Sequence, residues 1–278
     1  MEARTIHANG IDIHVVVAGI GPTILLLHGF PDTHHLWRHV TPHLVAAGFR
    51  VVMFDQRGYG KTSAPSEVDA YTVDRIASDA IEVLKQLGID EKVSLVGHDW
   101  GAVIGWYLCI KFPDFFERFV AVSVGHPLAY RNAGPSQWCK AWYVIMFQIR
   151  GLAEWLFSAN NFKALRDLSK DPEDQASRIS AFSPSGRITA ALNWYRANFK
   201  QFGTTSFGSC TVPTLGIYST GDVALTEKQM VDSEKYMKAE WKYVRIENST
   251  HWIPLDQPDT LSAEIVDWCR AGQFRRYG

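Results

Sequence analysis

The sequence contains few cysteines, and their wide spacing forms no metal-binding pattern. Only four occur in 278 residues: Cys109, Cys139, Cys210 and Cys269. The apolar runs are much shorter than the roughly 20 residues that span a bilayer. The first residues also lack the apolar centre of a secretory signal. We therefore expect a cytoplasmic protein with reduced thiols, no metal and no membrane span.

An excess of charge of one sign is also absent. Lys and Arg together number 28 and Asp and Glu 29, so the net charge is −1. This balance argues against a nucleic-acid partner, which requires a basic surface. Apolar residues are plentiful at 46%, and ten tryptophans contribute to an aromatic content of 13%. The length and composition fit one large α/β domain or a core with an inserted subdomain.

Short apolar runs alternate with helical patterns through most of the chain. Such runs are typical of strands that are covered on both faces. The predicted strands are 11–18, 23–27, 49–54, 92–96, 117–124, 211–218 and 241–247, and the predicted helices are 33–47, 72–87, 102–112, 225–238 and 259–271. This order predicts an α/β fold with a mostly parallel sheet and helices on both faces.

The strand pattern is interrupted between residues 126 and 210. This segment is rich in aromatics, and its patterns at 138–147, 152–162 and 188–199 are helical. We therefore expect an α/β core formed by residues 1–125 and 211–278. A helical cap domain, residues 126–210, is inserted into it.

One five-residue stretch, Gly97-His98-Asp99-Trp100-Gly101, lies between a predicted strand and a predicted helix. It has the spacing of a nucleophile elbow, with Asp where Ser is usual. Small residues on both sides let the backbone turn sharply and hold one side chain at the strand tip. A carboxylate held there would attack carbon and form an ester, so Asp99 is the predicted nucleophile.

Two further residues fit the partners that such a nucleophile requires. Asp222 follows the predicted strand 211–218, and His251 follows the predicted strand 241–247. Either residue alone would be read as part of an ordinary turn or loop. Together they follow Asp99 in the order nucleophile, acid, histidine, which is the order of the α/β-hydrolase fold. Parallel strands would gather all three at one edge of the sheet.

The segment His28-Gly29-Phe30-Pro31 follows the predicted strand 23–27. In this fold a loop at that place supplies one backbone N–H of the oxyanion hole, and the residue after the nucleophile supplies the other. Phe30 and Trp100 are the predicted donors. We also expect Phe30, Trp100 and Trp252 to line an apolar substrate pocket. His98 is interpreted as structural, since strand alternation directs it away from Asp99.

These motifs, together with Asp55-Gln56-Arg57-Gly58-Tyr59-Gly60-Lys61-Thr62-Ser63 and His251-Trp252, resemble the soluble epoxide hydrolases over nearly the whole chain. In that family two cap tyrosines hydrogen-bond the epoxide oxygen. Tyr195, in Leu192-Asn193-Trp194-Tyr195-Arg196, matches the second, and Tyr143 matches the first. Without the resemblance, aromatics at helical spacing would be assigned to the core.

The resemblance implies a reaction. Asp99 attacks an epoxide carbon while Tyr143 and Tyr195 activate the oxygen, and water activated by His251 and Asp222 hydrolyses the ester to a vicinal diol. The partners would be a small apolar epoxide and water, the role detoxification, and no cofactor would be needed. A monomer and a homodimer both fit the sequence.

Other functions remain open at this stage. Haloalkane dehalogenases resemble the chain through the same fold and Asp nucleophile, and a Trp after that Asp holds halide there. Fluoroacetate dehalogenases carry an Arg where Trp100 stands. A non-catalytic small-molecule receptor could also use this fold. Tyr195 favours the epoxide over the halide, and the complete set of Asp99, Asp222 and His251 argues against a receptor.

Overall fold

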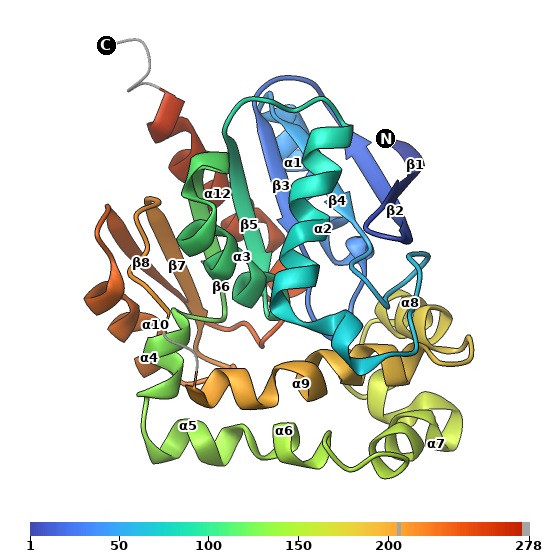
Figure 1. Ribbon diagram of the computed structural model, residues 1–278. Helices are drawn as coiled ribbons and strands as arrows, with labels where there is room; N and C mark the ends of the chain where they lie inside the picture. Colours follow the sequence, from blue (N-terminus) through green and yellow to red (C-terminus); the bar gives the residue numbers. More distant parts are fainter. Residues whose placement is uncertain (205–206, 274–278) are drawn as a thin grey trace.

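The structure is a computed structural model, and the residues it describes are 1–204 and 207–273. Within these residues the strands form one sheet of eight, in the order β1-β2-β4-β3-β5-β6-β7-β8 (Figure 1). The strands β3 to β8 pair in parallel, and β1 and β2 form an antiparallel edge. Their bounds are β1 Glu2–Ala8, β2 Ile11–Ala18, β3 Thr23–Leu27, β4 Arg50–Phe54, β5 Val93–His98, β6 Phe116–Val122, β7 Thr214–Ser219 and β8 Trp241–Ile246. The α/β-hydrolase fold predicted from the sequence is confirmed.

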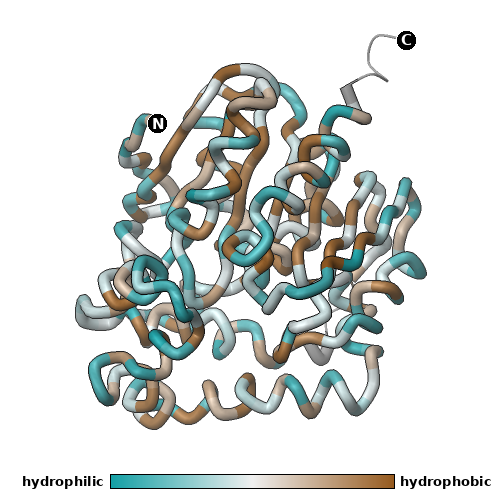
Figure 2. Tube along the Cα trace, turned by 180° about the vertical axis from the view of Figure 1, so that it is seen from behind, coloured by the Kyte–Doolittle hydropathy of each residue, from teal (hydrophilic) through white to brown (hydrophobic). Residues whose placement is uncertain are grey.

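Each face of the sheet has its own hydrophobic core. In β3, Leu25 and Leu27 pack into the core under the helices α2 (Val73–Gln86) and α3 (Trp100–Lys111). Ile24 and Leu26 pack on the other face, against α1 (Thr41–Ala46) and α12 (Pro258–Gln273). Alternate side chains of a strand point to opposite faces, so a strand covered on both sides is a continuous apolar run. Figure 2 shows these hydrophobic runs along the central strands.

The helices between β6 and β7 lie together beyond the carboxyl ends of the parallel strands, where Figure 1 shows them as a separate layer. We call them the cap helices: α4 Pro127–Arg131, α5 Pro135–Lys140, α6 Trp142–Met146, α7 Leu152–Arg166, α8 Pro172–Phe182 and α9 Arg187–Thr204. They lie within residues 126–210, the range predicted for the insertion. Residues 205–206 of the predicted cap and 274–278 of the predicted core lie outside the described residues. No helix in the described part of the chain is long and apolar enough to cross a membrane.

Some predicted elements were wrong in detail. The single helix expected over 33–47 is a 3₁₀ helix, His34–Trp37, followed by the separate helix α1. Pro42 occupies the first turn of α1, where its missing N–H costs no hydrogen bond. The helix expected over 225–238 likewise divides into α10 (Glu227–Val231) and a 3₁₀ turn, Asp232–Tyr236.

Strand β1 and the helices α4, α8 and α11 (Ile253–Asp256) were missed. Strand β1 is an edge strand whose first residues are exposed, so it lacks the apolar alternation that reveals a strand. Helix α8 carries a readable start, because the Asp171 side chain accepts a hydrogen bond from the Glu173 backbone N–H and Pro172 follows the cap.

Candidate active site

The strand β5 ends in a sharp turn that holds Asp99 just before α3. The backbone of Asp99 has φ 53° and ψ −122°, a conformation that non-glycine residues rarely adopt. The turn also needs close backbone approach. A Cβ at Gly101 would lie 2.0 Å from the carbonyl oxygen of Leu27, and one at Gly29 would lie 2.3 Å from Asp99 Oδ1. The glycines therefore let β3 and its loop close around the Asp99 carboxylate.

Both oxygens of the Asp99 carboxylate have polar neighbours. Oδ1 accepts a hydrogen bond from the Phe30 backbone N–H at 2.8 Å, and Oδ2 lies 3.5 Å from His251 Nε2. Burial works to raise the pKa of Asp99, but His251 and the Trp100 backbone amide outweigh it and lower that pKa. Asp99 is therefore held as a carboxylate, and both predicted oxyanion-hole amides contribute to its surroundings.

His251 lies between two carboxylates. Its Nδ1 is 2.7 Å from Asp222 Oδ2, while the other Asp222 oxygen accepts from the backbone N–H groups of Ala224 and Leu225 at 2.8 and 2.9 Å. Burial works to lower the pKa of His251, but Asp222 and then Asp99 raise it to about 10. At neutral pH the resting site therefore holds an imidazolium between two carboxylates.

His98 supports the loop that carries His251. Its buried ring donates from Nε2 to the His251 carbonyl oxygen at 2.8 Å, and Ser123 Oγ donates to the same oxygen at 3.2 Å. Burial lowers the pKa of His98 to about 4, so the ring is neutral. This placement agrees with the structural interpretation of His98.

A cavity of about 470 Å³ opens onto Asp99, and its walls are mostly apolar. Tyr143 and Tyr195 both line it, with ring centroids 6.3 Å apart, and the Trp100 ring lies 5.1 Å from Tyr195. Burial and the charge on Asp99 raise the pKa of both phenols, so both keep their protons. The full lining is Asp99, Trp100, Val103, Val124, Gly125, Pro127, Tyr130, Arg131, Trp138, Ala141, Tyr143, Val144, Ile145, Tyr195, Phe199, Lys200 and Leu225.

Two residues expected in this pocket lie elsewhere, since neither Phe30 nor Trp252 is among the described residues that line the cavity. The Phe30 ring packs edge-on against an aromatic cluster that includes Tyr195. The Trp252 indole donates to Asp32 Oδ2 at 2.8 Å, and the Arg178 guanidinium lies 4.7 Å above its ring. Trp252 therefore forms part of the contact between the cap helices and the core.

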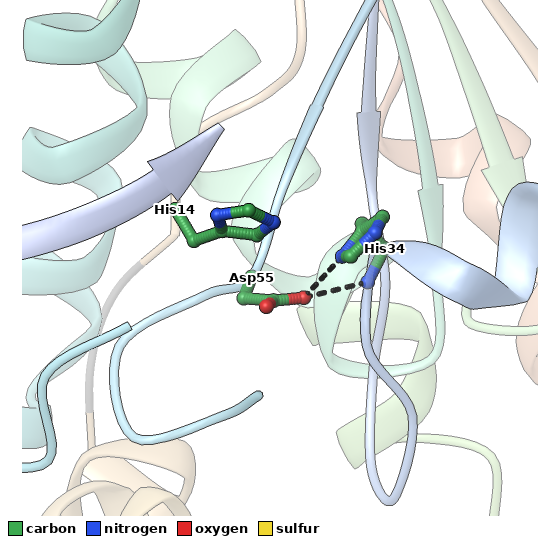
Figure 3. Close-up of side chains that lie close together, drawn as sticks. All are labelled: His14, His34 and Asp55. Atoms are coloured by element: carbon green, nitrogen blue, oxygen red, sulfur yellow. Dashed lines mark hydrogen bonds and ion pairs between the residues drawn. The ribbon is translucent and has the colours of Figure 1, made fainter. Parts of the chain in front are cut away.

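A group with metal-ligand chemistry, His14, His34 and Asp55, lies beside the loop after β4 (Figure 3). Their ligand atoms fall within 4.8 Å of one another. Asp55 Oδ1 accepts from the backbone N–H and from Nδ1 of His34, at 3.0 and 2.6 Å, and Oδ2 accepts from the Lys61 backbone N–H at 2.9 Å. These hydrogen bonds fasten the loop, and they give the carboxylate a structural role.

Residues 22–258 match the family described as the alpha/beta hydrolase fold. The chain is also 31% identical to epoxide hydrolase 3 of Siraitia grosvenorii, covering 96% of this chain and 98% of that protein. It is 32% identical to human epoxide hydrolase 4, covering 92% of this chain and 75% of that protein. A third relative, the AB hydrolase superfamily protein YfhM of Bacillus subtilis, is 31% identical over 97% of this chain and 98% of its own length.

Solved structures give the same result. An epoxide hydrolase of Vigna radiata superposes with a TM-score of 0.85 at 29% identity, covering 97% of this chain and 98% of that one. Epoxide hydrolase A of Mycobacterium thermoresistibile superposes with a TM-score of 0.81 at 26% identity, with the same coverage. The fold and the site thus define a hydrolase of the α/β-hydrolase class. Within that class, the chain belongs to the epoxide hydrolase family.

Proposed function

We propose that this protein hydrolyses epoxides to vicinal diols through an ester of Asp99. One observation carries the proposal: an ionised Asp99 faces an apolar cavity across from two protonated tyrosines, with a histidine and a second carboxylate behind it. The cavity suits a small uncharged substrate. Tyr143 and Tyr195 line this cavity, which supports a role for their hydroxyls as donors to an oxygen that becomes negative during the reaction.

In the first step, an Asp99 oxygen attacks an epoxide carbon and the C–O bond on the far side breaks. Tyr143 and Tyr195 hydrogen-bond the leaving oxygen, and one of them gives it a proton. The resulting tyrosinate recovers its proton from the His251 imidazolium. Ester formation also removes the negative charge of Asp99, one of the causes that raise the pKa of His251. His251 is then neutral and able to act as a base.

In the second step, His251 takes a proton from water while Asp222 stabilises the imidazolium. The hydroxyl attacks the ester carbonyl, and the backbone N–H groups of Phe30 and Trp100 hold the oxyanion. Such a donor contributes roughly 3–4 kcal/mol. Collapse of this intermediate releases the diol, which takes up the carboxyl proton, and restores the Asp99 carboxylate beside an imidazolium.

The haloalkane dehalogenase alternative depends on Trp100 as a halide donor. The Trp100 side chain makes a hydrogen bond with Tyr195, which lowers the pKa of that phenol against the larger effect of burial. A Trp100 indole directed to the tyrosine supports the epoxide reaction, because it helps to position the proposed acid. Assays of diol release from aryl and fatty-acid epoxides and of halide release from haloalkanes discriminate the two functions.

The variant His251→Gln tests the mechanism, because it removes the base of the second step while Asp99, Tyr143 and Tyr195 remain in place. We expect the ester to accumulate, since a general base accelerates such a step by about 10²–10⁴-fold. Mass spectrometry of the variant, mixed with an aryl epoxide, should show a mass increase equal to that epoxide on the peptide containing Asp99. The exposed His39, replaced by Gln, is the control and should show no adduct. Absence of adduct from His251→Gln with every epoxide tested would refute the ester.

A further inference from the structure

The outer side of the cap helices exposes an unusual number of large apolar side chains. Trp142, Ile145 and Trp155 are 64%, 65% and 62% exposed. We call the whole set the cap stripe: Trp138, Trp142, Ile145, Ile149, Leu152, Trp155 and Leu156. Scattered exposed apolar residues are ordinary, but a concentration of this kind in 19 consecutive positions marks an interaction surface.

The spacing of the cap stripe is helical. Its members follow one another at intervals of mostly three or four residues, and all are exposed, on α5, on α6, at Ile149 in the turn after α6, and at the start of α7. The opposite side of these helices is buried and includes Ala141, Phe147 and Ala153. Figure 1 shows α5 and α6 along the outer margin of the molecule, with α9 between them and the sheet. Most of the stripe is therefore exposed on the outer side of the cap helices.

The charge around the stripe is positive, although the whole chain carries −1. Residues 127–166 contain five Lys or Arg and a single acidic residue, Glu154. Glu154 is itself paired with Arg196, at 2.7 Å from its Nη1. Lys163 pairs with Asp167, directly after this range, and Lys140 donates to carbonyl oxygens of the core. Arg150 is the exposed cation within the stripe itself. Amphipathic helices with Trp on the apolar side and a cationic surround bind the interface of anionic bilayers. A dimer formed through the stripe would bring two positively charged segments together, and their repulsion disfavours it.

The stripe also borders the cavity. Trp138 and Ile145 belong to the stripe and line the cavity that opens onto Asp99. An apolar molecule dissolved in a bilayer would therefore meet the mouth of the cavity without crossing water. We propose that the cap stripe docks the protein on an anionic lipid surface. Docking depends only on the cap stripe and the charge around it, and it does not depend on which reaction Asp99 performs.

Co-sedimentation with vesicles tests the docking. Vesicles of equal parts phosphatidylglycerol and phosphatidylcholine should bind the full-length protein with a blue shift in its tryptophan fluorescence. Vesicles of phosphatidylcholine alone should bind it less, and high salt should weaken the binding to the anionic vesicles. Trp142→Ser with Trp155→Ser should lower the partition coefficient about tenfold or more, because two large aromatic side chains no longer enter the interface.

Two controls accompany this experiment. Ile20→Ser removes an even more exposed residue, 86% accessible, before β3 at the end of the sheet opposite the cap, and should leave vesicle binding unchanged. Arg150→Glu keeps the apolar stripe and should weaken binding to anionic vesicles only. Failure of the wild-type protein to sediment with anionic vesicles overturns the proposal. So does a dimer, seen by sedimentation velocity, that the two Trp substitutions dissociate.

Discussion

Tyr195 combines structural and chemical contacts in one side chain. Its ring is only 7% exposed and packs edge-on against Phe30, Trp100 and Phe147. These contacts fix the direction of the ring, so its hydroxyl is positioned before a substrate enters. A preorganised donor avoids the cost of reorienting during a reaction, and this is the advantage that the aromatic cluster would give to Tyr195 in the proposed mechanism.

Replacing Tyr195 by Phe keeps the packing and removes only the hydroxyl. We expect alkylation of Asp99 by an epoxide to slow by about tenfold to a hundredfold, since a hydrogen bond to a charged group contributes roughly 1.5–3 kcal/mol. Single-turnover kinetics measures this step directly. Tyr243→Phe is the matched control, because that hydroxyl donates to Glu227 beside β8. An unchanged rate in Tyr195→Phe would remove Tyr195 from the mechanism.

At the level of elements, a buried ion pair connects the loop after β4 to α2. Arg57 makes two hydrogen bonds to Asp79, at 2.8 and 2.7 Å, and both side chains are nearly inaccessible. The Arg57 carbonyl oxygen also accepts from the Trp194 indole of α9 at 2.9 Å. The same loop thus joins a helix of the core to a helix of the cap.

Arg57→Met should destabilise the protein by about 3–5 kcal/mol, because Asp79 would remain buried without its partner. Urea unfolding followed by circular dichroism measures this change. Adding Asp79→Leu to Arg57→Met should restore part of the lost stability, since the double variant buries no charge. A double variant less stable than Arg57→Met would contradict this explanation.

The elements predicted correctly from the sequence are those with a clear hydrophobic pattern of their own. The apolar run before Asp99 and the glycines around it specify the strand and the elbow locally, and the structure places Asp99, Asp222 and His251 together as expected. Edge strand β1 could not be seen, because its exposed side chains show no pattern. Trp252 was expected in the pocket, but its position depends on Asp32 and Arg178, which are distant in sequence.

The two cap tyrosines could not be predicted from the local sequence. Nothing in the local sequence separates Tyr143 and Tyr195 from the many other aromatics of residues 126–210. Only the resemblance to a family selected them, and the fold then placed both beside Asp99 in one cavity. Contacts of this kind depend on how the cap helices pack on the core, which periodicity does not encode.

Across the whole molecule, cap and core are joined by polar contacts at both ends of the site. Lys140 of α5 donates from Nζ to the carbonyl oxygens of Asp222 and Leu225, at 2.5 and 2.9 Å. On the other side, Arg178 of α8 pairs with Asp32 at 3.1 Å, and both side chains are buried. The cap therefore holds the loops that carry Asp222 and Phe30.

These contacts predict that cap and core unfold together. Asn198 of α9 adds to them, because its side chain accepts from the Val73 backbone N–H and donates to the Tyr71 carbonyl oxygen, both at 2.9 Å. Separating the layers would leave these buried polar groups without partners, which costs roughly 1–3 kcal/mol for each group. Scanning calorimetry should show one transition with a calorimetric enthalpy equal to the van't Hoff enthalpy. Two resolved transitions would mean that the cap helices form an independent folding unit.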